Sequence, residues 1–241
     1  MSDTVIIIPA RYGSTRLQAK ALLSIDGVTL VEQVWRRAIA VPNADVIVAT
    51  DHEKIAETVI NFGGTAVYTQ TSCASGSDRV AEAVAKLSRT YDNIINVQGD
   101  LPFINPSEIR ATLIPLTLGF DVGTLVACMP ESKQKNPSFV KAVVSTEQSS
   151  EVMQCHWFCR AALPYGHHHL GVYAYKRAAL YKYAQTLPHP LEQQESLEQL
   201  RFLTKGYRIG AILVSTLALE VNTDDDLQHA REYAKQQAYL V

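Results

Sequence analysis

Residues 4–20, TVIIIPARYGSTRLQAK, decide the fold of this chain. The run from Thr4 to Ile8 is β-branched throughout, which is typical of a strand buried on both faces of a parallel sheet. A polar loop from Ala10 to Lys20 follows the strand, and the apolar spacing of residues 30–38 then predicts a helix. A strand, a polar loop and a helix in this order are typical of an α/β protein.

The same alternation continues to residue 97. We predict strands at residues 44–49, 65–69 and 93–97. Between them, Thr50 to Glu53 has the pattern of a capping box that opens a helix, which ends near Gly63, and residues 75–87 contain a second helix. Such βαβ units predict a mostly parallel sheet, with active groups beyond the carboxyl ends of its strands.

The second half of the chain has more strands and fewer helices. We predict strands at residues 122–127, 140–144, 152–158 and 169–175, and helices at residues 177–185, 192–205 and 224–238. Part of this half extends the sheet, and part forms a smaller β-rich excursion. Because neither a low-complexity linker nor an internal repeat interrupts the sequence, we expect one domain that spans residues 1–241.

Composition excludes several classes of protein. The 241 residues are 47% hydrophobic and 19% charged with a net charge of −2, which disfavours a disordered chain and a basic nucleic-acid-binding surface. No stretch approaches the roughly 20 apolar residues of a membrane span, and the first residues lack the basic segment of a signal peptide. We therefore expect a cytoplasmic protein. Its four cysteines are then reduced thiols, and Cys155, His156 and Cys159 lack the second ligand pair of a typical zinc site.

The loop after the first strand carries the clearest chemistry. It places Arg11, Arg16 and Lys20 beside Gly13 and two hydroxyl side chains, a composition that suits a polyphosphate. The loop matches neither a P-loop nor a dinucleotide-binding fingerprint. A solvated basic loop is the alternative, and the position directly after strand one favours phosphate binding.

Seven segments, in order from residue 5 to residue 227, resemble the CMP-Kdo synthetases, which are 3-deoxy-manno-octulosonate (Kdo) cytidylyltransferases. They are IIIPARYGSTRLQAKAL, ATDHEKIAE, ASGSDR, NVQGDLPFI, HLGVYAY, PLEQQESLEQLR and VNTDDDL. The resemblance implies a Rossmann-like α/β fold of the nucleotide-diphospho-sugar transferase type, a mostly parallel sheet flanked by helices. It also implies that the β-rich excursion serves dimerisation.

The resemblance implies a reaction in which the anomeric hydroxyl of Kdo attacks the α-phosphate of CTP and releases pyrophosphate, giving CMP-Kdo for lipopolysaccharide biosynthesis. The catalytic residues that it implies are Arg11, Arg16, Lys20 and Asp100. Those implied to bind CTP are Ala10, Arg11, Ser14, Arg16, Lys20, Ser75, Gly76, Arg79 and Gln98. Asp100 and Asn222 match the positions that bind Mg²⁺, the cofactor, and hard oxygen ligands suit that ion.

Six residues match family positions that line the sugar pocket: Gln98, Arg160, His169, Tyr173, Glu195 and Gln199. His169 and Tyr173 are four apart on a predicted strand, and Glu195 and Gln199 are four apart on a predicted helix. Each pair is therefore expected to share a face.

Some of the implied site residues also have purely structural interpretations. Ser75 suits the N-cap of a helix as well as a nucleotide site, and Asp100 suits a turn.

The chain departs from the family pattern at four places. The family's LPGK is Leu17-Gln18-Ala19-Lys20, and the acid that follows Asp100 in the family is Leu101. The segment after Pro164 is shorter. The family's VDT is Val221-Asn222-Thr223, so a neutral carbonyl oxygen replaces the second metal-binding carboxylate. The acids at 224–226 suit the first turn of a helix.

We predict an active Mg²⁺-dependent cytidylyltransferase that forms a homodimer, because the three cations, Gln98 and Asp100 are retained. One alternative is an enzyme for a related sugar acid such as 8-amino-Kdo. The other is a catalytically impaired homologue that binds CTP, with metal-assisted chemistry lost at Asn222.

Overall fold

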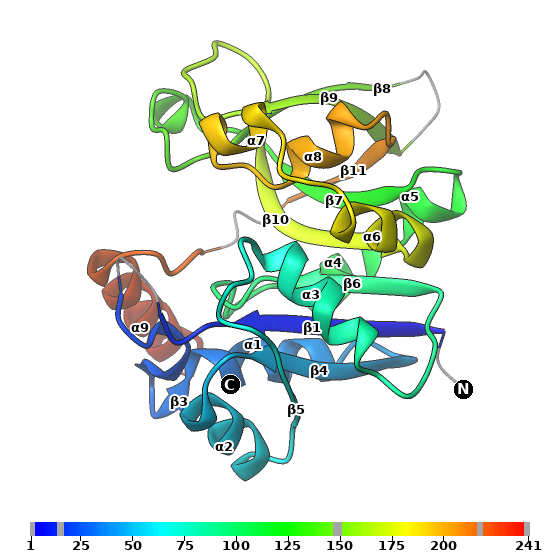
Figure 1. Ribbon diagram of the computed structural model, residues 1–241. Helices are drawn as coiled ribbons and strands as arrows, with labels where there is room; N and C mark the ends of the chain where they lie inside the picture. Colours follow the sequence, from blue (N-terminus) through cyan, green and yellow to red (C-terminus); the bar gives the residue numbers. More distant parts are fainter. Residues whose placement is uncertain (1–2, 14–16, 147–150, 216–218, 239–241) are drawn as a thin grey trace. The chain divides into compact units, whose positions relative to one another are not determined.

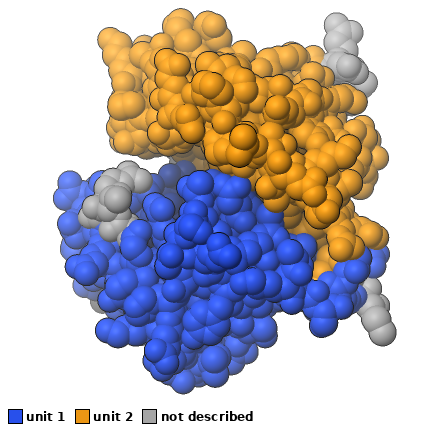
Figure 2. All heavy atoms as spheres, viewed as in Figure 1, with its two compact units in different colours: residues 1–90, 96–106, 218–241 blue, residues 91–95, 107–217 orange. Residues whose placement is uncertain are grey.

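The computed structural model describes residues 3–13, 17–146, 151–215 and 219–238 (Figure 1). Its contacts divide the chain into two compact units, shown in different colours in Figure 2. Unit 1 comprises Met1–Thr90, Asn96–Pro106 and Ala218–Val241, and unit 2 comprises Tyr91–Ile95 and Ser107–Leu217. The single domain over residues 1–241 stays a prediction.

Unit 1 contains the parallel strands that the first third of the sequence predicts. Strand β1 (Thr4–Ala10) pairs in parallel with β4 (Ala44–Thr50), and β4 pairs in parallel with β5 (Thr65–Tyr68). On its other side β1 neighbours β6 (Asn93–Val97), of which only the last two residues belong to unit 1, so the order is β5-β4-β1-β6. Residues 5–8 of β1 are completely buried, as the β-branched run predicts.

Helices cover the strands of unit 1. They are α1 (Leu30–Ile39), α2 (Glu53–Asn61), α3 (Gly76–Ala85) and α9 (Asp224–Ala238), with a short 3-10 helix, η1 (Lys20–Leu22). Helix α1 packs on β1 and β4, α2 on β4 and β5, and α3 on β1 and β4. Helix α9 lies against the small hairpin of β2 (Ser24–Ile25) and β3 (Val28–Thr29). Leu17, Leu30, Val221 and Leu227 share one hydrophobic cluster, so the two ends of the chain are packed together there.

Unit 2 is mainly antiparallel. Its strands are β7 (Val122–Ala127), β8 (Lys141–Thr146), β9 (Val152–Cys159), β10 (His167–Lys176) and β11 (Ile209–Val214), in the order β10-β7-β11-β9-β8. Only the β11–β7 pair is parallel among these strands. The start of β10 also pairs with β8. The α/β class is confirmed, and the β-rich part consists of the mainly antiparallel strands of unit 2.

Short helices connect these strands: α4 (Pro106–Ala111), α5 (Ile114–Thr117), η2 (Glu131–Lys133), α6 (Arg177–Ala184), α7 (Pro190–Glu195) and α8 (Gln199–Thr204). The single helix predicted over residues 192–205 is wrong. Ser196 adopts a left-handed conformation, with a φ of 54°, and this ends α7 before α8 begins.

The predicted capping box places the N-cap of α2 at Thr50, and this position is also wrong. The N-cap is His52, whose Nδ1 accepts a hydrogen bond from the backbone N–H of Lys54, and not Thr50. In the part of the chain that the structure describes, no helix is long and apolar enough to cross a membrane.

Candidate active site

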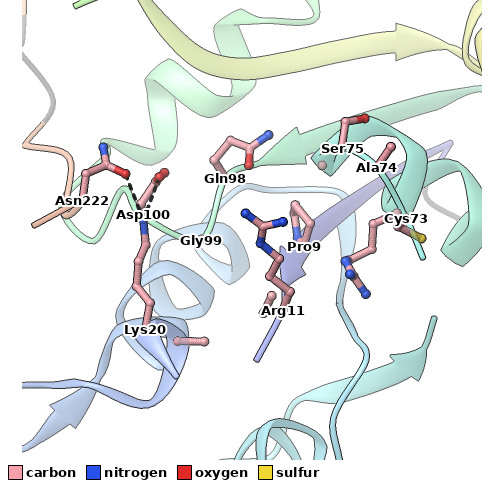
Figure 3. A pocket seen from close by; sticks show the side chains of 14 residues that line it. Pro9, Arg11, Lys20, Cys73, Ala74, Ser75, Gln98, Gly99, Asp100 and Asn222 are labelled. Atoms are coloured by element: carbon pink, nitrogen blue, oxygen red, sulfur yellow. Dashed lines mark hydrogen bonds and ion pairs between the residues drawn. The ribbon is translucent and has the colours of Figure 1, made fainter. Parts of the chain in front are cut away.

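A pocket of about 240 Å³ lies in unit 1, where β1 and β6 end (Figure 3). Its lining comes from the end of β1, the start of η1, the N-terminus of α3, the turn after β6 and the segment before α9. These residues are Pro9, Ala10, Arg11, Lys20, Ala21, Cys73, Ala74, Ser75, Gly76, Arg79, Gln98, Gly99, Asp100 and Asn222. Every described residue predicted to bind CTP or metal is among them. The predicted Ser14 and Arg16 fall outside the residues that the structure describes.

Two glycines allow the walls of this pocket to approach each other. A Cβ on Gly99 would lie 3.1 Å from the carbonyl oxygen of Pro9, so the turn after β6 packs closely on the end of β1. A Cβ on Gly76 would lie 2.7 Å from Nε2 of Gln98, so the Gln98 amide lies against the first turn of α3. These contacts explain why glycine stands at both positions.

The N-terminus of α3 faces the pocket. Ser75 is the N-cap: its Oγ accepts a hydrogen bond from the backbone N–H of Asp78 at 3.1 Å and donates to the Asp78 carboxylate at 2.7 Å. The predicted capping role is therefore confirmed. A helix N-terminus carries partial positive charge and favours an anionic group nearby.

Arg79 is held in place by a network that the sequence analysis did not identify. Its Nη2 donates to Oδ2 of Asp51 at 3.0 Å, and its Nη1 donates to Oγ1 of Thr69 at 2.6 Å. The other oxygen of Asp51 accepts from the backbone N–H of Tyr12 at 2.9 Å. Asp51 thus links the loop after β1 to Arg79. Its position directly after strand β4 was the available signal, since active groups gather at such strand ends.

Two further cations line the pocket. Arg11 is exposed and has no ion-pair partner among the residues that the structure describes. Lys20 is half-buried, and its Nζ lies 3.1 Å from Oδ2 of Asp100 and 3.1 Å from Oδ1 of Asn222 (Figure 3). Together with Arg79 and the start of α3, these side chains make the pocket a positively charged surface suited to phosphate.

Asp100 and Asn222 are brought together by backbone contacts. The N–H of Val221 donates to the carbonyl of Asp100 at 2.9 Å. The Asp226 carboxylate then accepts from the backbone N–H groups of Asn222 and Thr223 at 3.0 and 2.8 Å. This carboxylate lies in the first turn of α9, where the sequence predicts favourable acids.

The oxygens of Asp100 and Asn222 both face the cationic Nζ of Lys20, so they converge on one point where a positive charge is stabilised. One carboxylate and one carbonyl oxygen fit Mg²⁺, which keeps several waters and completes its shell with substrate phosphates. Among the described residues, no group of three or more His, Cys, Asp or Glu side chains could hold a metal.

Glu220 adds a carboxylate that the sequence analysis did not identify. Its Oε2 accepts a hydrogen bond from Nδ2 of Asn222 at 3.2 Å. Burial and the neighbouring negative charge of Asp100 raise the pKa of Glu220 to about 8. Nearby, burial and the Glu82 carboxylate raise the pKa of Cys73 to about 11, so this thiol in the pocket wall is neutral at pH 7.

The predicted sugar-binding residues other than Gln98 lie in unit 2. The backbone N–H of Arg160 donates to Oε2 of Glu195 at 3.0 Å, and the Arg160 Nε donates to the Glu195 carbonyl at 3.1 Å. The rings of His169 and Tyr173 lie 5.4 Å apart on β10, so the predicted shared face is confirmed, despite a bulge between Leu170 and Tyr173. Unit 2 therefore brings together two pairs of these residues.

The predicted shared helix face of Glu195 and Gln199 is wrong, because Ser196 separates α7 from α8. Gln199 is 2% exposed, and its Nε2 has no hydrogen-bond partner among the described residues. Burial lowers the pKa of His169 to about 3, so its imidazole is neutral at pH 7, and Nε2 lies 3.1 Å from Oγ1 of Thr124.

The departures from the family pattern have visible structural effects. Ala19 has a φ of 50°, a conformation that favours glycine, and its N–H bonds to the carbonyl of Tyr12. Leu101 is 1% exposed, so the residue after Asp100 joins the core and does not face the pocket. The short segment after Pro164 turns at Gly166, with a φ of 102°, where a Cβ would lie 3.0 Å from the carbonyl oxygen of Ala142.

One pocket is surrounded by strand ends, a cationic loop and a helix N-terminus. This arrangement is typical of a nucleotide-binding α/β protein. Comparison with known proteins narrows this class. The cytidylyltransferase family profile matches residues 5–209. A 3-deoxy-manno-octulosonate cytidylyltransferase of Elusimicrobium minutum is 39% identical, over 98% of this chain and 99% of that protein. Its counterpart in Rhodopseudomonas palustris is 44% identical, over 95% and 96% of the two chains.

A solved structure gives the same result. The CMP:2-keto-3-deoxy-manno-octonic acid synthetase complexed with CTP matches with a TM-score of 0.90 and 36% identity, over 98% of this chain and 100% of that one. The chain therefore belongs to the 3-deoxy-manno-octulosonate cytidylyltransferase family, and the resemblance found in the sequence is confirmed.

Proposed function

We propose that this cytidylyltransferase transfers CMP from CTP to the anomeric hydroxyl of Kdo with the help of Mg²⁺, releasing pyrophosphate and forming CMP-Kdo for lipopolysaccharide biosynthesis. The observation that carries the proposal is the pocket of unit 1, which joins Arg11, Lys20, Arg79 and the N-terminus of α3 to an oxygen pair at Asp100 and Asn222. The names of the full-length relatives and of the CTP complex support the two substrates.

In this reaction the anomeric oxygen forms a bond to the α-phosphorus while the bond from that phosphorus to the β-phosphate oxygen breaks. Negative charge accumulates on the pyrophosphate that leaves. Arg11 and Lys20 neutralise this charge, and the backbone N–H groups at the start of α3 add partial positive charge. Arg79 is fixed by Asp51 before any ligand binds, so its guanidinium needs no reorganisation.

Asp100 and Asn222 would hold the Mg²⁺ ion, which supplies electrostatic stabilisation of phosphate charge when bound. Nζ of Lys20 lies 3.1 Å from Oδ2 of Asp100 and 3.1 Å from Oδ1 of Asn222. Removing the lysine charge would therefore leave both the oxygens and the phosphates without their neighbouring cation.

Kdo carries a carboxylate and several hydroxyl groups, and the residues proposed for it match that chemistry. Arg160 supplies a cation, whose Nη1 donates to the Pro137 carbonyl at 3.0 Å. Tyr173, the neutral imidazole of His169 and the unpartnered Nε2 of Gln199 supply hydrogen-bonding groups in unit 2. An unpartnered buried amide donor costs free energy, and a sugar hydroxyl that accepts from it would remove that cost.

The test is pyrophosphate release from CTP plus Kdo across a titration of Mg²⁺. We expect turnover that requires Mg²⁺ and that falls by at least about 100-fold in Asp100→Asn, the size of loss typical of a removed electrostatic contact. The exposed variant Asp225→Asn, in the first turn of α9, is the matched control and should retain full activity.

Other outcomes separate the alternatives. Turnover with 8-amino-Kdo and little with Kdo would assign a related sugar acid. CTP binding without turnover on either sugar would assign an impaired binding homologue. We also propose that the protein acts in the cytoplasm as a homodimer through the β-rich part of unit 2, and a monomeric mass by light scattering would refute the dimer.

A further inference from the structure

Thr124 contributes a hydroxyl group to the part of unit 2 that contains His169. It lies on β7, opposite the point where the pairing with β10 shifts register between Leu170 and Tyr173. Such a shift frees backbone carbonyls from the ladder. Oγ1 of Thr124 lies 2.8 Å from the carbonyl oxygen of Val172 and 3.4 Å from that of Leu170. Because Thr124 is completely buried, its hydroxyl makes its hydrogen bonds within the protein.

The single proton of this hydroxyl determines the direction of its bond to His169. A backbone carbonyl can only accept, so the contact of 2.8 Å requires Thr124 to donate its proton to the carbonyl of Val172. Oγ1 then has only lone pairs left for Nε2 of His169, which lies 3.1 Å away. A neutral imidazole at this position therefore has its proton on Nε2, and its Nδ1 keeps a lone pair that accepts.

Packing holds the ring of His169 in place. The ring meets that of Phe158 edge-on, with 4.8 Å between the ring centroids, and the backbone N–H of His169 donates to the carbonyl of Val140 at 2.9 Å. Burial lowers the pKa of His169 to about 3, so the ring is uncharged at pH 7. The tautomer then decides which ring nitrogen donates and which accepts, and the hydroxyl of Thr124 selects the tautomer.

We propose that Thr124 is a positioning residue for the sugar acid: its hydroxyl holds His169 in the tautomer with the proton on Nε2, so that Nδ1 accepts a hydrogen bond from a hydroxyl group of the sugar. The inference rests on the proposed function, because it concerns the sugar site of that reaction. The carboxylate of the sugar acid can only accept, so it is excluded from Nδ1 and left to the cation of Arg160.

The ¹⁵N shifts of the imidazole ring report the tautomer directly, because a protonated ring nitrogen and one with a free lone pair give separate signals. The full chain is labelled with ¹⁵N in its seven histidines, and the signals of His169 are those lost in His169→Gln. In the unchanged protein we expect the proton on Nε2. Thr124→Val should shift His169 toward the tautomer with the proton on Nδ1, because an N–H at Nε2 would be buried without an acceptor.

Kinetics test what the tautomer does for the substrate. We expect Thr124→Val to raise KM for Kdo by about tenfold with KM for CTP unchanged, since the tautomer that accepts from the sugar becomes the minor one. Thr124→Ser keeps the hydroxyl and should stay within about threefold of the unchanged protein.

Thr112→Val is the matched control. Thr112 is also completely buried, and its Oγ1 donates to the carbonyl of Ile109 at 2.6 Å, so this variant loses a comparable hydrogen bond without touching a histidine. It should leave the tautomer of His169 and both KM values unchanged. Thermal unfolding of each variant identifies a folding defect.

Two results would overturn the proposal: a proton on Nδ1 of His169 in the unchanged protein, or a folded Thr124→Val that keeps the tautomer or the KM for Kdo of the unchanged protein. The first needs no variant, so it decides the matter even if Thr124→Val does not fold. Failure of the proposed function has a different signature. In that case the ¹⁵N spectra show the expected tautomers, but CTP and Kdo yield no pyrophosphate.

Discussion

The guanidinium of Arg79 and the carboxylate of Asp51 form a nearly buried ion pair, with Nη2 3.0 Å from Oδ2 and side-chain exposures of 3% and 8%. Neither charge can be solvated if the other is removed. The pair therefore serves two purposes, because it holds Arg79 against the pocket and neutralises a buried positive charge.

Asp51→Asn should lower the free energy of unfolding by about 3 kcal/mol, since Arg79 would keep a buried and uncompensated charge. It should also raise KM for CTP. Asp45→Asn is the control: it breaks the Asp45–Arg89 pair, whose side chains are 45% and 35% exposed, and should change stability by less than about 1 kcal/mol. Equal stability of the two variants in urea titrations would show that burial of the Arg79 pair is unimportant.

Ala19→Gly should stabilise the protein. Ala19 has a φ of 50°, and a left-handed backbone costs an L-residue with a Cβ about 1 kcal/mol relative to glycine. The control Ala40→Gly changes an exposed alanine with a φ of −76° at the end of α1, where glycine should destabilise. If both substitutions lower the midpoint of thermal unfolding, the strain at Ala19 is not relieved by glycine.

The variant Gln199→Leu should show whether Gln199 binds the sugar substrate or only packs in the core. Because Nε2 of Gln199 has no partner among the described residues, its removal should change the free energy of unfolding by less than about 1 kcal/mol. In the proposed reaction, KM for Kdo should rise by about tenfold with KM for CTP unchanged. Gln193→Leu, on the exposed side of α7, should leave both constants unchanged. A strong loss of stability with an unaltered KM for Kdo would assign Gln199 to the core alone.

Stability should decrease as the pH falls below about 6.5, in part because of His168. Burial, aided by the charge of Lys141, lowers the pKa of His168 from 6.5 to about 4. Between these values the unfolded chain binds the proton and the folded protein does not, so acid favours unfolding. At pH 5 this effect amounts to about 2 kcal/mol.

His168→Gln should flatten the pH dependence of the free energy of unfolding between pH 7 and pH 5, measured by urea titration at each pH. His229→Gln, at an exposed position of α9, should leave the slope unchanged. Identical slopes in the two variants would contradict the assignment to His168.

The local pattern of apolar and polar residues was enough to predict several helices and strands. The strand predicted at residues 93–97 and the helix predicted at residues 224–238 match β6 and α9 residue for residue. Strand β11 was not predicted, and its Gly210 weakens the strand pattern. A Cβ at Gly210 would lie 2.7 Å from the Pro115 side chain, so a tertiary contact requires glycine at this position. The local sequence around Gly210 does not reveal that contact.

Residues of the candidate site could be predicted where several of them lie in one loop, as Arg11 and Lys20 do. Asp51 and Glu220 were missed for a physical reason: each acts on a residue that is placed beside it by folding or by a backbone turn. The break at Ser196 was missed because buried residues continue on both sides of it, so the apolar spacing of one long helix persists.

The contact between Lys20 and Asn222 joins residues that are 202 positions apart. Lys20 leaves the ribosome early and Asn222 late, so the pocket lacks one wall during most of synthesis. A growing chain can form the β1 strand and its cationic loop long before the opposing oxygens exist. The order in which the chain is made therefore delays the complete site until the last segment before α9 has folded back onto the first loop.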